Sequence, residues 1–189
     1  MLQASQQQKA LPRSNATKQS DSPLVLPSLA ADCGSLAHLY MELIAKNGLE
    51  HWPASRIDAC SQSMQFWLLQ RGHAKIEVDK YVSLVISALK CTISSPEGAW
   101  ILASRASSQS ELSISSEIEE QRIDLTFVEN GTRWIVDYKL GLDVTETNAP
   151  FAALVHKPQL EGYASLFSSE KLPIKPAVFF LILGKLIKL

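Results

Sequence analysis

Two aspartates and a lysine around a predicted β-turn have the residue types and the spacing of a hydrolytic site. Asp124 precedes the dipeptide Asn130-Gly131, and Asp137 and Lys139 follow it. An Asn-Gly pair flanked by alternating apolar residues is a strong signal for a two-residue β-hairpin turn. Counting outward from this turn places Asp124 directly opposite Asp137 on the partner strand.

Carboxylates that face each other across a hairpin repel, because their Cβ atoms lie only about 4.5–5.5 Å apart. A divalent cation would offset this repulsion, and Mg²⁺ commonly binds one or two carboxylates together with substrate phosphate oxygens. Lys139 lies two residues beyond Asp137 and therefore on the same face, whereas Tyr138 lies on the other. These residues predict metal-assisted phosphodiester hydrolysis, with the lysine orienting the attacking water. A surface hairpin in which Lys139 simply pairs with one aspartate is the alternative interpretation.

The elements that must position this hairpin follow from the apolar periodicity. The first half of the chain has helical spacing, and period-two alternation begins near Gln109. We expect helices over residues 32–47, 53–72 and 78–89, strands around 112–114, 123–127, 134–138 and 178–182, a loop over 141–154 and a helix over 156–168. The predicted order is therefore several helices, three strands, a helix and a final strand.

Composition limits the class of protein. The 189 residues are 46% hydrophobic with a net charge of −1, which suits one core. Residues 1–29 are rich in Gln, Ser, Asn, Ala and Pro and predict a flexible tail or linker, which leaves residues 30–189 as the domain. No apolar run approaches the roughly 20 residues that span a bilayer, and the start does not resemble a signal peptide. We therefore expect a cytoplasmic protein without membrane segments.

Further residues share the chain order of a known family. Besides Ile123-Asp124 and Asp137-Tyr138-Lys139, they are Gly34 with His38, Glu111 with Leu112, and Gln159 with Tyr163. Together they resemble the PD-(D/E)XK nucleases, in the form of the RecB/AddA-type exonuclease domains of bacterial helicase–nucleases. The resemblance covers roughly residues 30–189. It implies a restriction-endonuclease-like α/β core, a mixed sheet flanked by helices, here with a helical N-terminal part.

The resemblance also implies a role for each residue. Asp124 and Asp137 would hold Mg²⁺ or Mn²⁺, with His38 and the Tyr138 carbonyl as further ligands, and Lys139 would act on the water. The remaining motif residues would support the site or contact DNA; they are Glu111 at the first strand, and Gln159 and Tyr163 on the helix after the lysine. His51, His73 and His156 match no motif, and we expect them at the surface or in packing.

The implied activity is metal-dependent cleavage of DNA by a domain of the kind appended to a repair or recombination helicase. The implied partners are DNA and helicase domains or subunits. The chain has no G-x-x-x-x-G-K-[ST] sequence, so it is not by itself an ATP-driven helicase. A catalytically silent DNA-binding or helicase-interaction domain is one alternative. A nuclease that acts on RNA is another, because nothing in the sequence recognises a 2′-hydroxyl.

Overall fold

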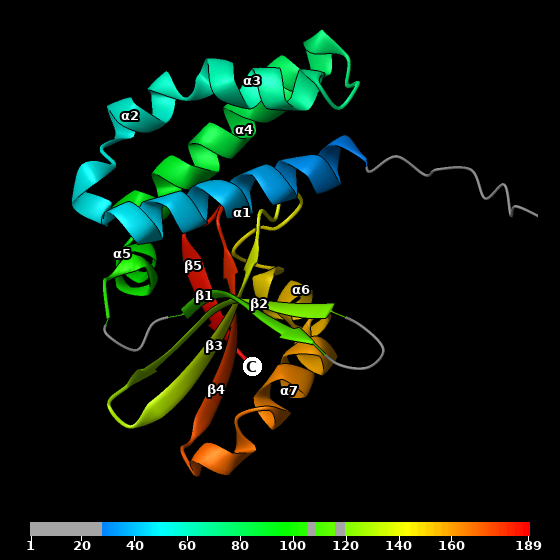
Figure 1. The fold of residues 1–189 in the computed structure, drawn as a ribbon. Helices are drawn as coiled ribbons and strands as arrows, with labels where there is room; N and C mark the ends of the chain where they lie inside the picture. The colour runs from blue at the N-terminus through cyan, green and yellow to red at the C-terminus, as the bar shows by residue number, and fades with distance from the viewer. Residues whose placement is uncertain (1–27, 106–108, 116–119) are drawn as a thin grey trace, which may run out of the picture.

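A five-stranded mixed sheet lies at the centre of the computed structural model, which describes residues 28–105, 109–115 and 120–189 (Figure 1). The strands lie side by side in chain order: β1 (Gln109–Ser115), β2 (Glu120–Glu129), β3 (Thr132–Lys139), β4 (Ile174–Phe180) and β5 (Lys185–Lys188). Only β3 and β4 run parallel, and the other neighbours are antiparallel. The expected α/β class, with a mixed sheet flanked by helices and a helical N-terminal part, is confirmed.

The helices form two groups that cover opposite faces of the sheet (Figure 1). The first group precedes the sheet in the chain: α1 (Leu29–Asn47), α2 (Ala54–Ala59), α3 (Ser61–Leu69), α4 (Lys75–Ser94) and α5 (Pro96–Leu102), with a 3₁₀ turn at Leu49–His51. The second group connects β3 to β4: α6 (Ala149–Leu154) and α7 (Lys157–Ser165), followed by a 3₁₀ turn at Ser168–Glu170. This connection is the crossover that a parallel strand pair requires.

Local sequence signals set the helix ends. Ser28 caps α1, because its Oγ accepts a hydrogen bond from the backbone N–H of Ala31 at 3.2 Å, and Gly48 ends the helix with φ of 89°. Ser95 caps α5 in the same way through the N–H of Gly98, and a proline opens that helix.

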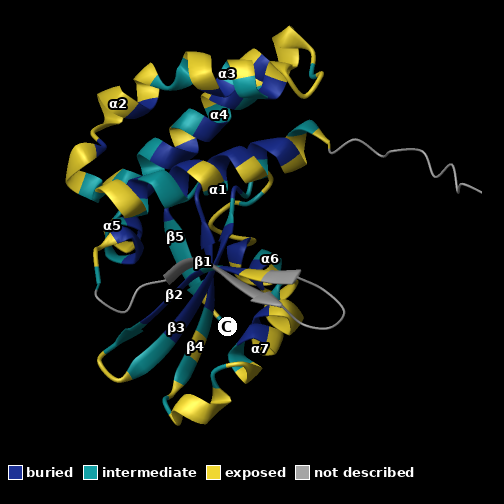
Figure 2. Ribbon diagram, viewed as in Figure 1, coloured by how far each residue is buried: buried dark blue, intermediate teal, exposed yellow. Residues whose placement is uncertain are grey.

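Two apolar cores lie on the two faces of the sheet. The larger core joins α1, α4 and α5 to the face that carries Phe127, Val136 and Phe179. The smaller core joins α6 and α7 to the face that carries Ile135 and Val178. The central strand β3 is consequently buried on both faces from Trp134 to Tyr138, as Figure 2 shows in dark blue.

The expected hairpin forms with its expected register. Asn130 and Gly131 have φ of 50° and 69°, and the strand pairs run from Glu129 opposite Thr132 to Leu125 opposite Val136. The ladder ends there, so the predicted pair of Asp124 and Asp137 is not a backbone-bonded pair. Beyond this point β2 leaves β3 and crosses toward α7 (Figure 1).

Several predicted boundaries are wrong. The helix expected over 53–72 is two helices that meet at Cys60, and α4 extends to Ser94. The loop expected over 141–154 contains α6. The last strand ends at Phe180, and a turn at Gly184, with φ of 61°, leads into the unpredicted strand β5. Of the predicted tail, residues 1–27 lie outside the described residues.

Among the described helices, none combines the length and the apolar character needed to cross a bilayer.

Candidate active site

The predicted metal and water-activating residues come from three elements that meet at the carboxyl end of β3. His38 lies in the middle of α1, Asp124 lies where β2 leaves β3, and Asp137 and Lys139 end β3 itself. The carboxyl ends of parallel strands are common positions for ligand sites in α/β proteins. Residues separated by about a hundred positions in sequence are therefore brought together.

Asp124 is fixed by the backbone of the neighbouring strand. Its Oδ2 accepts a hydrogen bond from the N–H of Tyr138 at 2.7 Å, which takes the place of the next ladder bond. Its Oδ1 lies 3.3 Å from Nδ1 of His38. Each oxygen of the Asp124 carboxylate therefore has its own partner, Tyr138 for Oδ2 and His38 for Oδ1.

His38 links α1 to both strands. Its Nε2–H donates a hydrogen bond to the carbonyl oxygen of Tyr138 at 2.8 Å, and its Nδ1 faces Asp124. Burial opposes the charged imidazolium, but the contacts with Asp124 and the Tyr138 carbonyl outweigh burial and raise the pKa of His38. The imidazole therefore already occupies a site that favours a positive charge between two oxygen atoms.

Asp137 is a buried carboxylate whose charge is incompletely compensated. Only 5% of the residue is exposed, and its Oδ2 lies 2.8 Å from Nζ of Lys139. The contact is an ion pair, and among the described residues no hydrogen bond to any other group is found at this oxygen. Burial raises the pKa of Asp137, with a further increase from the charge of Asp124 that opposes the decrease caused by Lys139.

These groups fit a hard divalent cation. The site offers oxygen atoms from Asp124, Asp137 and the Tyr138 carbonyl, and one imidazole from His38, which are ligand types that Mg²⁺ and Mn²⁺ accept. The buried Oδ2 of Asp137 pairs with Lys139 and has no hydrogen bond among the described residues, so it is a candidate ligand. Within the described residues, no three His, Cys, Asp or Glu side chains are already gathered as a complete metal cluster. Metal binding would therefore need these side chains to move closer together.

Gln159 and Tyr163 lie on α7 and support the site through β2, without lining it. The Tyr163 hydroxyl donates to the backbone carbonyl of Arg122 at 3.0 Å and accepts a hydrogen bond from Nε2 of Gln159 at 2.8 Å. Tyr163 is 3% exposed, so α7 holds β2 two residues before Asp124 through a buried contact. Glu111 lies in β1, but its side chain is outside the described part of the structure.

His156 matches no motif and was expected at the surface or in packing; it is partly exposed and lines a pocket together with Lys139. His156 precedes α7 and lies close enough to Lys139 for the lysine charge to add to the effect of burial, and together they lower the pKa of His156. The signal was weak, because a lone histidine before a helix has no characteristic spacing. His73 is structural, since its Nε2 lies 2.6 Å from Oδ2 of the buried Asp32.

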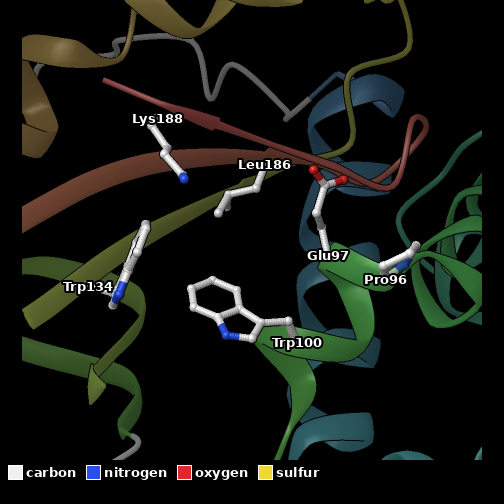
Figure 3. Close-up of a pocket in the computed structure, with 6 residues that line it drawn as sticks. All are labelled: Pro96, Glu97, Trp100, Trp134, Leu186 and Lys188. Carbon is white, nitrogen blue, oxygen red and sulfur yellow. The ribbon is translucent and has the colours of Figure 1, made fainter. Parts of the chain in front are cut away.

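The C-terminal lysines do not reach this site. Lys185 forms an ion pair with Glu146 at 2.8 Å, and Nζ of Lys188 lies 5.7 Å from the centre of the Trp134 ring. Lys188 lines a separate pocket of about 280 Å³ with Trp100, Trp134 and Glu97 (Figure 3). Trp134 belongs to the larger core and is 8% exposed, and Glu97 is the one acidic residue among the described residues that line this pocket.

No protein-family model matches the chain, and no significant match is found among curated proteins.

Proposed function

We propose that the chain is a metal-dependent DNA nuclease with a restriction-endonuclease-like core, of the PD-(D/E)XK type appended to repair or recombination helicases. The observation that carries the proposal is the buried Asp137, whose Oδ2 lies 2.8 Å from Nζ of Lys139. Asp124 is close enough for its charge to add to the effect of burial, and together they raise the pKa of Asp137. Burial beside a second carboxylate disfavours the charged form of Asp137, and a divalent cation would offset this cost.

Each residue has a task in this proposal. Asp124 and Asp137 hold Mg²⁺ or Mn²⁺, with His38 and the Tyr138 carbonyl completing the protein ligands. The bound cation supplies Lewis acidity and neutralises charge on the phosphate. Lys139, half-buried at the end of β3, orients the attacking water and contacts a phosphate oxygen. Gln159 and Tyr163 keep β2 in place, and they act on the reaction only through Asp124.

The test is cleavage of end-labelled single-stranded and double-stranded DNA and RNA by the purified chain, with Mg²⁺, Mn²⁺ or EDTA. We expect DNA cleavage that requires metal and that is lost in both Asp137→Asn and Lys139→Ala. Asp58→Asn is the matched control, because Asp58 is exposed and pairs with Lys90 at 3.0 Å on another part of the surface.

A catalytically silent DNA-binding or helicase-interaction domain is the second candidate. DNA binding without cleavage in either metal, unchanged in both site variants, would support this candidate and reject the nuclease. Cleavage of RNA but not of DNA would support the hydrolytic site and would show that the substrate is RNA.

A further inference from the structure

A pocket of about 430 Å³ opens directly beside Lys139. Its lining residues come from the first half of α1, the end of β3 and the loop that follows it, α6 with the residues before α7, and the end of β4. Its volume is within the range of about 300–1,000 Å³ that is usual for small-molecule sites. The proposed water-activating residue therefore forms one wall of a space large enough for part of a substrate.

The pocket is lined by hydrogen-bonding groups at Lys139 and His156, by the acidic residue Asp143 and by several apolar residues. Lys139 and His156 both line it, and both can donate hydrogen bonds to a phosphate oxygen. Val144, Val155 and Phe180 are among the apolar residues of the lining. A ligand with one anionic group and an apolar body would match these residues.

Asp143 adds a further restriction, because its carboxylate also lines the pocket. A carboxylate repels phosphate and accepts hydrogen bonds only from O–H and N–H groups. A ligand that is anionic throughout is therefore disfavoured, whereas a sugar hydroxyl or an exocyclic amine can bond to Asp143.

Gly34 leaves part of this pocket open. It lies inside α1, where glycine is among the least favourable residues, and it lines the pocket. A Cβ at this position would meet no atom within 4 Å, and the backbone does not have a positive φ. Packing and backbone conformation therefore do not explain the glycine, whereas at Gly98 a Cβ would lie 1.9 Å from the Thr92 carbonyl oxygen.

We propose that this pocket holds a nucleoside of the substrate, on one side of the phosphodiester addressed by Lys139. The base and sugar lie against the apolar walls and below Gly34, and the attached phosphate lies at Lys139 and His156. This assignment rests on the proposed nuclease function and adds a nucleoside-binding site to it. Val155, which is 76% exposed, forms the apolar edge of the pocket.

The test is a substitution on α1 that fills the pocket with a larger side chain. Gly34→Leu places a side chain in it, and leucine favours the helix more than glycine does, so the variant should fold. Gly162→Leu is the matched control, because Gly162 lies in helix α7, a Cβ there also meets nothing within 4 Å, and it does not line the pocket. Gly34→Ala adds only a methyl group and should keep most binding.

The readouts are binding of dAMP and dTMP by calorimetry with the full chain, and steady-state cleavage of single-stranded DNA. We expect Gly34→Leu to weaken nucleotide binding by about tenfold or more, and to raise KM for DNA more than it lowers kcat. Gly162→Leu should match the wild type in both. Inorganic phosphate should bind equally to all variants, because it does not reach the apolar walls.

The two proposals fail in different ways. Wild-type nucleotide affinity in Gly34→Leu, or no binding of either nucleotide to the wild type, overturns the nucleoside site even when DNA is cleaved. A wild type that cleaves no nucleic acid overturns the nuclease function. If that protein still binds nucleotides and loses them in Gly34→Leu, the nucleoside site stands alone.

Discussion

The backbone N–H of Tyr138 donates a hydrogen bond to Oδ2 of Asp124 at 2.7 Å, one position beyond the last backbone pair of the β2–β3 hairpin. A side-chain carboxylate thus replaces a main-chain carbonyl as the acceptor. Ile123 consequently packs with α6 and α7, whereas Leu125 packs in the larger core, although two residues of a regular strand share one face. The strand bends at the residue that the nuclease proposal uses as a metal ligand.

Replacement of Lys139 by alanine should reduce DNA cleavage by about 10²–10⁴-fold while metal affinity stays nearly unchanged. The lysine acts on water and phosphate, and the ion is held by the carboxylates. Single-turnover cleavage and Mn²⁺ titration by calorimetry measure the two effects separately. Lys157→Ala is the control, because Lys157 is an exposed lysine whose Nζ lies 3.8 Å from Oε1 of Glu161. Wild-type cleavage by Lys139→Ala would remove the lysine from the mechanism.

Replacement of His38 by alanine should raise the Mn²⁺ concentration needed for half-maximal cleavage by about tenfold or more. One of several ligands is lost, and so is the hydrogen bond from α1 to the Tyr138 carbonyl. The same variant should lower the free energy of unfolding in EDTA by about 1–3 kcal/mol. His51→Ala is the control, because His51 is exposed and lies beside Glu50. An unchanged metal titration would show that His38 only supports the fold.

Replacement of Asp137 by asparagine should have opposite effects on stability without and with metal. Because burial raises the pKa of Asp137, the folded protein in EDTA loses stability as the pH rises through that raised pKa. The neutral asparagine removes this loss, so the variant should be more stable than the wild type at pH 7 without metal. This gain in stability from removing the buried charge must exceed the stability lost with the ion pair to Lys139.

Saturating Mg²⁺ or Mn²⁺ should reverse that order. An ion that binds the folded wild type stabilises it by about 2.7 kcal/mol at a hundredfold excess over its dissociation constant, and asparagine binds the ion far less well. Urea unfolding of both proteins in EDTA and in metal checks the reversal. If metal stabilises both proteins equally, Asp137 is not a ligand.

Replacement of Tyr163 by phenylalanine should lower the free energy of unfolding by about 1 kcal/mol and reduce cleavage without changing the buried ring. The hydroxyl is the contact between α7 and the Arg122 carbonyl, so β2 and Asp124 lose a support. Gln159→Ala is the comparison, because it removes only the exposed donor to the same hydroxyl. Equal cleavage by wild type and Tyr163→Phe would leave Tyr163 with a packing role.

The sequence alone determined the features that depend on neighbouring residues. Asn130-Gly131 selects the hairpin and its register, because both residues adopt positive φ. Alternation then puts Asp137 and Lys139 on one face, and their 2.8 Å contact agrees with that placement. The periodicity of α1 and α4 was equally clear, because their apolar residues repeat with the helical period along one buried face.

Only the tertiary structure decided what depends on contacts between distant segments. The four residues of β5 and the six of α6 are too short for a clear periodic signal, and each is stabilised by packing on β4 and its neighbours. His156 reaches Lys139 only because the β3–β4 crossover returns α7 to the sheet. The bend at Asp124 likewise has a contact from a distant segment beside it, because the Tyr163 hydroxyl of α7 donates a hydrogen bond to the Arg122 carbonyl of β2.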